Sequence, residues 1–489
     1  EPKDGLMEHE MPRFDDRMSD AEALMWRVEK DPFLTSTFAN ITVLDRTIDF
    51  EAFVARMNRA SIAIPRLRQR VQPTPVASGA PRWVRDPEFN IRHHVRRMAL
   101  PYPGSMRQLQ DLTTLIANDA FDRSRPLWQF VIVEGLEGGQ SALIQKLHHT
   151  VTDGQGGVAL SMQFLDLTRD AAPLPPLPEP DDTSHQSATQ AAGEVLSSSF
   201  NDVMRTPLAL LRQVREVLSD PLGLPAVGTQ AAAAVQGLVA ELQSVDPARS
   251  PLWTQRSLQR QLETLRVPYR DLLDASRALG GKLNTAFLTA AADAAGRYHY
   301  EKGSPVESLR TSMAISTRNE SSGANAFTLT RMLVPTLQMP ITERFAAINE
   351  IISVAREQAK AASLDTLATM SALLPTTVLT RIARTQSQTV DFATSNVRGA
   401  GVPLFIGGAL VLGNYPVGPL GGVAFNLTML SYNHNLDMGL NVDTAAVTDP
   451  ELLRECVEDS MRELINSSRP TTVAVGEKPK FRLRWWKRR

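Results

Sequence analysis

The heptapeptide His148-His149-Thr150-Val151-Thr152-Asp153-Gly154 carries the strongest structural signal in the chain. Residues 141–147, just before it, are typical of a strand, and the apolar positions of 158–167, just after it, recur at helical spacing. The two histidines are therefore expected where a strand ends and the chain turns into a helix. Gly154 allows a positive φ or a close approach at that turn. An imidazole at such a junction can face a cleft with a pKa near neutrality and accept a proton.

The length and composition predict a globular protein with two cores. The chain has 489 residues, of which 43% are hydrophobic and 21% charged, and its formal net charge is −1. A chain of this length normally divides into domains of roughly 100–200 residues. These values indicate neither disorder nor nucleic-acid binding. The single cysteine, Cys456, cannot form an internal disulfide and favours a reducing compartment, and its helical surroundings predict that it is buried.

The polarity of the two ends predicts a cytoplasmic protein that contacts a membrane only at its surface. The longest apolar run, 401–413, is shorter than the ~20 residues that a membrane helix needs, and the acidic N-terminus is not a signal peptide. Residues 478–489 contain seven basic and no acidic residues. Interleaved with these cations are the residues predicted to contact the inner face of the membrane or a lipid droplet: Phe481, Arg484, Trp485 and Trp486. A solvated tail and RNA binding are the alternatives for this segment.

The order of the expected elements predicts an α+β fold in which two similar halves face each other across a central cleft or tunnel. We expect an N-terminal domain over 1–170, a Pro-rich linker and helical connector over 171–253, a C-terminal domain over 254–470 and a basic aromatic tail over 471–489. Strands are expected at 38–44, 128–135, 141–147, 309–316, 327–334, 390–396, 404–412, 426–433 and 439–443. Helices are expected at 19–26, 50–60, 109–120, 191–242 with breaks, 271–279, 285–298, 343–360 and 450–466.

His149 is the candidate general base. It could deprotonate a hydroxyl or an amine, which would then attack an activated acyl group directly. The Gly-x-Ser-x-Gly, His-Glu-x-x-His and Gly-x-x-x-x-Gly-Lys patterns are absent from the sequence, which argues against a serine nucleophile, a catalytic metal and ATP chemistry. We expect His148 to be structural. Asp153 could polarise His149 or form an ion pair that fixes the loop.

Two further histidine positions serve as a comparison. His93 and His94 form a second His-His pair, but they lie in a basic stretch without a following Asp-Gly, and we expect them on the surface of a strand. His434, in the sequence Tyr-Asn-His-Asn, is expected in a turn.

His-His-x-x-x-Asp-Gly at a strand–helix junction resembles the signature of the superfamily of chloramphenicol acetyltransferase and peptide-synthetase condensation domains. Further stretches narrow the resemblance to the bacterial wax ester synthase/diacylglycerol acyltransferases. The stretches similar to motifs of that family are Pro126-Leu127-Trp128, Asn284 after 279–283, Ser395-Asn396-Val397 and Pro416-Val417-Gly418-Pro419. The resemblance extends from Met18 to about Asn466 in the same order.

The resemblance implies two chloramphenicol acetyltransferase-like domains with a tunnel between them. Acyl-CoA would enter as co-substrate from one side, diacylglycerol or a long-chain alcohol from the other, and no cofactor or metal would be needed. His149 would be the base. The residues that would support it are His148, Asp153, Gly154, Pro126, Leu127, Trp128 and Asn284. Pro-Leu-Trp would have a structural role near the site.

Two departures from the family pattern bear on the acceptor. Thr285 stands where the family usually has Asp, and Arg398 follows Ser-Asn-Val where it usually has Pro. Both could alter the acceptor pocket or the packing between the domains, so another lipid acceptor stays open. The alternative functions are an acyltransferase or condensation enzyme that uses a carrier-protein thioester, and a non-catalytic lipid-binding protein on the same fold.

Overall fold

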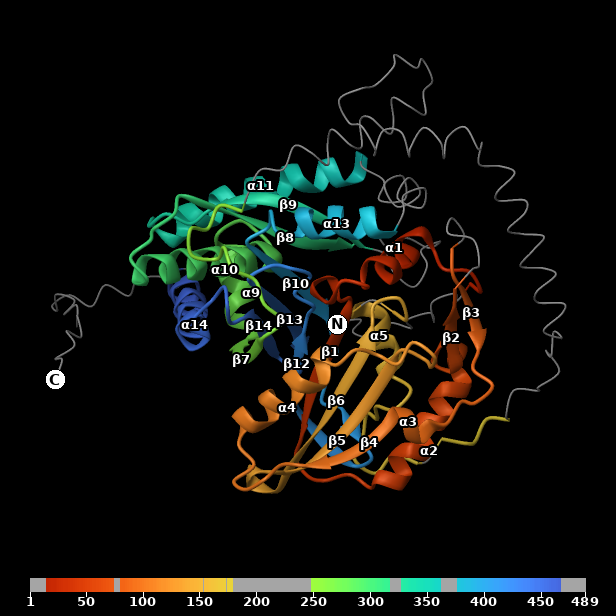
Figure 1. Cartoon of the computed structure of the whole chain (residues 1–489). Helices are drawn as coiled ribbons and strands as arrows, with labels where there is room; N and C mark the ends of the chain where they lie inside the picture. Colours follow the sequence, from red (N-terminus) through yellow and green to blue (C-terminus); the bar gives the residue numbers. More distant parts are fainter. Residues whose placement is uncertain are drawn as a thin grey trace, which may run out of the picture.

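Two halves, each with its own sheet and covering helices, make up the computed structural model of the chain (Figure 1). The structure describes residues 15–73, 80–152, 154–172, 174–178, 248–316, 327–361 and 376–467. The predicted α+β architecture of two mixed halves is confirmed. The expected helical pattern of 191–242 and the tail of 471–489 lie outside the described residues. The predicted domain boundaries stay a prediction.

The N-terminal half is built on a six-stranded sheet. The strand order is β11 (Phe405–Ile406), β12 (Ala409–Val417), β1 (Thr37–Leu44), β6 (Gln140–His148), β5 (Trp128–Leu136) and β4 (Val95–Ala99). Strands β4 and β5 run parallel, and the other neighbouring pairs are antiparallel. Strand β6 is buried along its length after the first residue, because β1 and β5 pair with its two edges and apolar side chains cover its faces. This strand leads to the two histidines.

The C-terminal half contains a second six-stranded sheet. Its order is β7 (Arg260–Pro268), β14 (Asn435–Asp443), β13 (Phe425–Tyr432), β10 (Phe392–Arg398), β8 (Ser308–Ser316) and β9 (Phe327–Pro335). Strand β10 is parallel to both of its neighbours, which places its carboxyl end beside that of β13. The remaining pairs are antiparallel.

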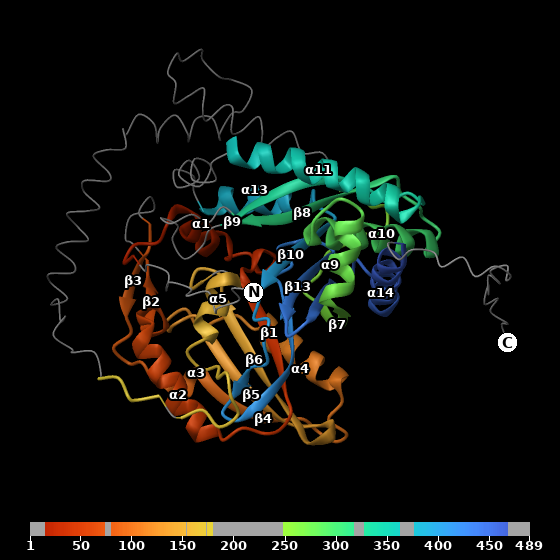
Figure 2. The same cartoon turned by 180° about the vertical axis from the view of Figure 1, so that it is seen from behind.

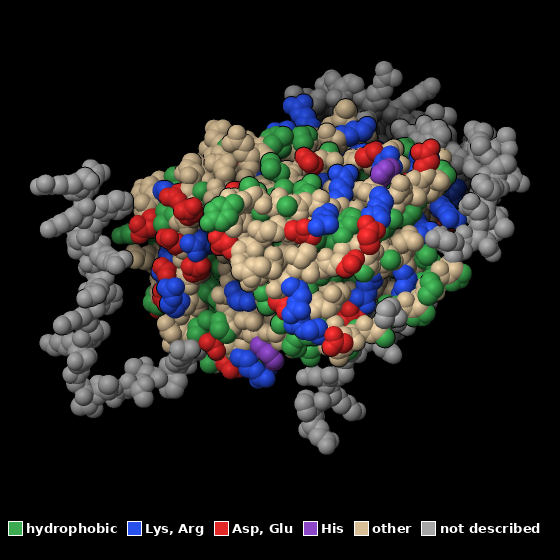
Figure 3. Space-filling model, turned by 90° about the horizontal axis from the view of Figure 1, so that it is seen from below, with side chains coloured by type: hydrophobic (Ala, Val, Ile, Leu, Met, Phe, Trp, Pro, Cys, Tyr) green, Lys and Arg blue, Asp and Glu red, His purple; other side chains and the backbone are tan. Residues whose placement is uncertain are grey.

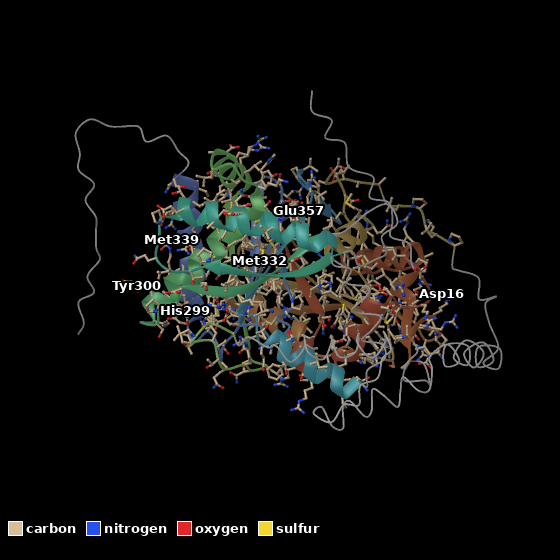
Figure 4. All side chains as sticks on the ribbon, turned by 90° about the horizontal axis from the view of Figure 1, so that it is seen from above. Asp16, His299, Tyr300, Met332, Met339 and Glu357 are labelled. Atoms are coloured by element: carbon tan, nitrogen blue, oxygen red, sulfur yellow. The ribbon has the colours of Figure 1, made fainter. Side chains whose placement is uncertain are left out.

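Helices cover the sheets and form the cores. Those of the N-terminal half are α1 (Asp20–Val28), α2 (Phe50–Ala63), α3 (Ile91–His94), α4 (Met106–Asn118) and α5 (Gly154–Ser161). This half also contains the short 3-10 helices η1 (Pro32–Leu34), η2 (Pro65–Arg68) and η3 (Glu137–Gly139). Strands β2 (Gln69–Gln72) and β3 (Arg82–Arg85) form a separate small sheet. Those of the C-terminal half are α9 (Tyr269–Ala278), α10 (Leu283–Glu301), α11 (Ile341–Ala361), α13 (Thr376–Ser387) and α14 (Pro450–Ser467). Seen from above, α11 lies across β9, the strand that carries Met332 (Figure 4).

Several local predictions are confirmed. The helix expected at 19–26 is present as α1, and Ser19 and Glu22 form a capping box at its start. The last hairpin turns at Asn433 and His434, which both have positive φ, as a two-residue turn between twisted strands requires. Cys456 is buried in α14, and burial raises the pKa of its thiol to about 12. A thiol in this state is not a nucleophile near neutral pH.

The prediction that His93 and His94 lie on a strand surface is wrong for His94. The short helix α3 turns His93 outward and His94 inward, and the strand starts only at Val95. The His94 ring stacks on Trp128 at 4.6 Å between centroids, and its Nδ1 donates to the Trp128 carbonyl at 2.8 Å. Burial lowers the pKa of His94 to about 4. The basic residues around this pair gave no sign that one of its rings is part of the core.

The prediction of a single strand over 404–412 is also wrong. A turn at Gly407 and Gly408, both with positive φ, divides this stretch into β11 and β12. Strand β12 then continues to Val417 and pairs with β1 from Ala39 to Leu44, with a register shift between Val43 and Leu44. The C-terminal half of the sequence thus supplies one edge of the N-terminal sheet, as the blue strand beside the red one in Figure 2 shows.

Strand β12 also contacts β14, and so it joins the two sheets. The buried Asp437 of β14 accepts a hydrogen bond from the backbone N–H of Asn414 at 2.7 Å and pairs with Arg266. Gly439 lies so close to β12 that a Cβ atom there would be 1.9 Å from the Pro416 carbonyl oxygen. Only glycine permits this approach, so the junction depends on the absence of a side chain.

We predict that His94 makes the protein less stable in acid. Its pKa is 6.5 in the unfolded chain but about 4 in the folded one, so the unfolded state alone takes up a proton as the pH falls between these values. The resulting loss of unfolding free energy is of the order of 3 kcal/mol. Replacing His94 with Phe keeps an aromatic ring and should flatten the dependence of stability on pH between 7 and 4, measured by denaturant unfolding at several pH values.

The matched control is His93→Phe, since His93 is the exposed neighbour. This variant should keep the wild-type slope. Equal slopes for wild type and His94→Phe would contradict the assignment.

Candidate active site

The structure places His149 where the sequence predicts, one residue beyond the end of β6 and before α5. Its backbone N–H donates to the Ser36 carbonyl at 3.0 Å, so the position of the residue is set by the start of β1. Its ring lies against the ring of Phe38, with 4.7 Å between centroids and a tilt of 42°. The side chain is half-buried, in contrast to its neighbour His148. The imidazole is therefore fixed on one side and accessible on the other.

His148 points into the N-terminal half and is 1% exposed. Its Nδ1 accepts a hydrogen bond from the Thr150 backbone N–H at 3.1 Å. Nε2 therefore carries a proton and donates it to the Glu29 carboxylate at 2.6 Å. Both ring nitrogens are thus occupied within the protein.

Glu29 is a residue that sequence reasoning missed. It caps the end of α1, and its side chain is 14% exposed. Oε1 accepts from the Thr35 hydroxyl at 2.8 Å and the Ser36 N–H at 3.1 Å. Oε2 accepts from His148 and, at 3.2 Å, from Arg123. Nothing local in the sequence marks this acid, because its partners are brought together only by the tertiary fold.

The ionisation of Glu29 follows from these contacts. Burial by itself raises the pKa of the carboxyl, but the hydrogen bond and charge interaction with His148 oppose it, as do the hydrogen bonds from Thr35 and Ser36. The net effect is a pKa below the usual value for glutamate. Glu29 is therefore a carboxylate at neutral pH, half-buried behind the turn that carries the two histidines.

The Pro126-Leu127-Trp128 motif lies beside the same turn, and its three side chains are buried. The Leu127 carbonyl accepts the backbone N–H of His148 at 3.1 Å. The Trp128 ring donates from Nε1 to the Leu67 carbonyl at 2.8 Å and stacks on His94. The motif thus holds the end of β6 from the side opposite to Ser36.

Residues of the C-terminal half approach from across the molecule. Asn284 lies at the start of α10, and its side-chain carbonyl accepts a hydrogen bond from Asn396 of β10. Strand β10 contacts α5, the helix that follows the histidine turn. The two asparagines, 112 residues apart in sequence, therefore connect two C-terminal elements, one of which touches the N-terminal site.

The two departures from the family pattern have different surroundings. Thr285 is buried, and its hydroxyl donates to the Asn349 side chain of α11 at 3.0 Å. Gly281, one turn earlier, lies against the same helix, and a Cβ there would be 2.5 Å from the Phe345 ring. Thr285 therefore joins α10 to α11. Arg398 is exposed at the end of β10.

Some predicted site residues cannot be placed. Asp153 lies outside the described residues, so neither of its proposed roles is tested, and Gly154 is the first residue of α5. The predicted membrane-contact residues, Phe481, Arg484, Trp485 and Trp486, also lie outside them. Within the described ranges, no three His, Cys, Asp or Glu side chains are arranged to hold a metal ion. No helix of those ranges combines the length and apolarity needed to cross a membrane.

Comparison with solved structures shows which fold the chain shares with known proteins. The chain is similar to the wax ester synthase/diacylglycerol acyltransferase of Marinobacter aquaeolei VT8, with a TM-score of 0.63 and 20% identity over 93% of this chain and 100% of that one. It is also similar to the starter condensation domain of rhizomide synthetase, with a TM-score of 0.54 and 14% identity over 92% and 94% of the two chains. The fold is therefore the one that these two structures share.

Sequence comparison then assigns the family. The wax ester synthase/diacylglycerol acyltransferase catalytic domain matches residues 13–287, and the C-terminal domain of the same family matches 323–465. A Mycobacterium tuberculosis H37Rv protein named as a diacylglycerol O-acyltransferase is 31% identical over 93% of both chains. A second protein of that strain, named as the diacylglycerol O-acyltransferase tgs1, is 26% identical over 87% of this chain and 90% of its own. The chain belongs to the wax ester synthase/diacylglycerol acyltransferase family and is an O-acyltransferase.

We predict that Asn284 and Asn396 act as a unit. Because the two side chains share one hydrogen bond, Asn284→Ala and Asn396→Ala should each lower kcat/KM about 10-fold, and the double variant should lose little more than either single one. Acyl transfer measured for the four proteins of this cycle checks the coupling. Fully additive losses would show that the two residues act independently.

Proposed function

We propose that the chain is an acyl-CoA-dependent lipid O-acyltransferase in which His149 is the general base. The observation that carries this proposal is the contrast between the two histidines. His148 is buried with both nitrogens occupied, whereas His149 is half-buried at a turn anchored by Ser36. A base needs a fixed ring with one nitrogen available to substrate. Because the Nδ1 of His149 is buried, Nε2 is the nitrogen that serves this purpose.

The proposed reaction is a direct transfer. Nε2 of His149 accepts the proton of the acceptor hydroxyl as its oxygen attacks the thioester carbonyl of acyl-CoA. A C–O bond forms, the C–S bond breaks, and the imidazolium returns the proton to the CoA thiolate. No acyl-enzyme is needed, and the deeply buried thiol of Cys456 does not serve as a nucleophile. The reaction uses acyl-CoA as co-substrate without a cofactor.

The proposed acceptors are diacylglycerol, giving triacylglycerol, and long-chain alcohols, giving wax esters. The names of the relatives and the family support both. Phe38, half-buried against His149, offers an apolar wall at the reacting hydroxyl. A passage from either side between the two halves to His149 is part of this proposal, with the thioester and the hydroxyl meeting at the ring.

We predict that His149→Ala lowers acyl transfer by roughly 10²–10⁴-fold without loss of folding. CoA release from palmitoyl-CoA should be measured with diacylglycerol and with hexadecanol, and products from mixed acceptors identified by mass spectrometry. His93→Ala, an exposed histidine outside the site, is the matched control and should keep full activity. Full transfer by His149→Ala would refute the mechanism, and activity only with a phosphopantetheinyl carrier would favour the condensation-type alternative.

We also propose that the tail attaches the enzyme to the inner face of a membrane or to lipid droplets. Its cations favour anionic headgroups at ~1 kcal/mol each, and its aromatic rings favour the interface. The face of the described residues in Figure 3 intersperses acidic with basic side chains instead of forming one basic surface. We assign the attraction to an anionic membrane to residues 478–489, because this segment has seven basic and no acidic residues.

We predict that replacing Phe481, Arg484, Trp485 and Trp486 with Ala weakens binding to vesicles of anionic phospholipid at least 10-fold. Sedimentation with vesicles of different anionic content measures this, and higher salt should weaken wild-type binding further. Transfer between short, water-soluble substrates should be unchanged. Equal vesicle binding by the variant and wild type would refute the role of the tail.

A further inference from the structure

We propose that Glu29 is a positioning residue for His149, which it acts on through Ser36 and His148. This inference rests on the proposed role of His149 as the base. Glu29 itself does not contact His149 but binds the groups on either side of it. Its function would be to hold the catalytic ring in one place.

The first link runs through Ser36. The Ser36 N–H donates to Oε1 of Glu29 at 3.1 Å, and the Ser36 carbonyl accepts the His149 N–H at 3.0 Å. The Thr35 hydroxyl donates to the same oxygen at 2.8 Å. Glu29 therefore fixes the peptide that anchors the backbone of the proposed base. A shift of the Ser36 peptide would move His149 directly.

The second link runs through His148, which precedes the base. The Thr150 N–H places the proton of His148 on Nε2, and this proton is donated to Oε2 of Glu29 at 2.6 Å. An amide in place of the carboxylate would present an N–H group or a weaker acceptor to this proton. Glu29 thus selects both the tautomer and the orientation of His148, and through the peptide bond the direction in which His149 leaves β6.

Cations on other elements also surround the Glu29 carboxylate. Arg123, in the loop before Pro126, donates to Oε2 and lies 4.0 Å above the ring of Trp26. The charge of Glu29 opposes the fall that burial causes in the pKa of Lys146 of β6, whose Nζ donates to the Asp119 carbonyl at 2.7 Å. The Glu29 carboxylate is therefore surrounded by groups from four parts of the N-terminal half: α1, the start of β1, β6 and the loop before β5.

The energetics argue against stability as the sole reason for this arrangement. A buried ion pair often contributes less stability than apolar residues of similar volume, because desolvation offsets much of the attraction. What such a cluster does supply is a defined geometry with directional hydrogen bonds. A displacement of about 1 Å at a reacting group is enough to lower a rate on the order of 100-fold.

The experiment compares Glu29→Gln, Glu29→Asp and Glu134→Gln in the full-length enzyme. Glu134 is a matched control, since it is a β5 carboxylate paired with Arg97 at the hairpin end of the same sheet, away from His149. We expect Glu29→Gln to lower kcat about 10- to 100-fold with the KM for palmitoyl-CoA changed less than about two-fold. Glu29→Asp should recover part of kcat, and Glu134→Gln should match wild type.

Imidazole ¹⁵N NMR of the histidine-labelled enzyme supplies a second readout. The His148 signal is identified by its absence from the spectrum of His148→Gln. This signal should indicate an Nε2–H tautomer in wild type and in Glu134→Gln, and it should change in Glu29→Gln. This readout does not depend on turnover, so it tests the position of His148 even if the wild-type enzyme transfers no acyl groups. A lack of acyl transfer by wild type would refute the proposed function but not the positioning of His148 by Glu29.

Three outcomes would overturn the inference. The first is wild-type kcat in Glu29→Gln. The second is a loss of kcat that only matches a loss of folded protein, measured by circular dichroism on the same samples. The third is a His148 signal that is the same with and without the carboxylate. If Glu29→Gln does not fold, Glu29→Asp and its NMR spectrum decide between these results.

Discussion

The structure of the site depends on strand β6 being paired along both edges up to its last residue. The backbone N–H of His148 donates to the carbonyl of Leu127, the residue before β5. The backbone N–H of His149 donates to the carbonyl of Ser36, the residue before β1. Since alternate residues of a strand face opposite sides, this pairing leaves little freedom in where the chain turns. The sharp difference between the two histidines follows from it, because one ring is directed into the protein while the next leaves the sheet.

The second constraint is the contact between the two sheets. Strand β12 belongs to the N-terminal sheet by its pairing with β1 and to the C-terminal sheet by its contact with Asp437 and Gly439. Burial raises the pKa of Asp437 although Arg266 opposes this. Helix α4 adds a hydrogen bond from Gln110 to Thr264 of β7. The halves are therefore joined by close backbone approach and by buried polar contacts.

Local sequence patterns were sufficient for the elements and for the position of His149. The capping box at Ser19, the hairpin turn at His434 and the strand before His148 all depend on neighbours in sequence. The contacts that could not be predicted join residues far apart in sequence. Glu29 and His148 are 119 residues apart, and the burial of His94 depends on Trp128. The family resemblance implied roles for the motifs but did not point to Glu29. The partners of Glu29 come together only when β1 pairs with β6.

Strand β12 is synthesised long after its partner β1, and this order has a consequence for folding during translation. During translation, strand β1 emerges some hundreds of residues before Ala409–Val417, its partner on one edge. Until the ribosome has passed this point, β1 presents unpaired N–H and C=O groups on that edge, which invites pairing with other nascent chains. The N-terminal sheet is thus complete only after Ala409–Val417 has been made, and cleavage or premature termination before Ala409 would leave β1 as an exposed edge strand open to aggregation.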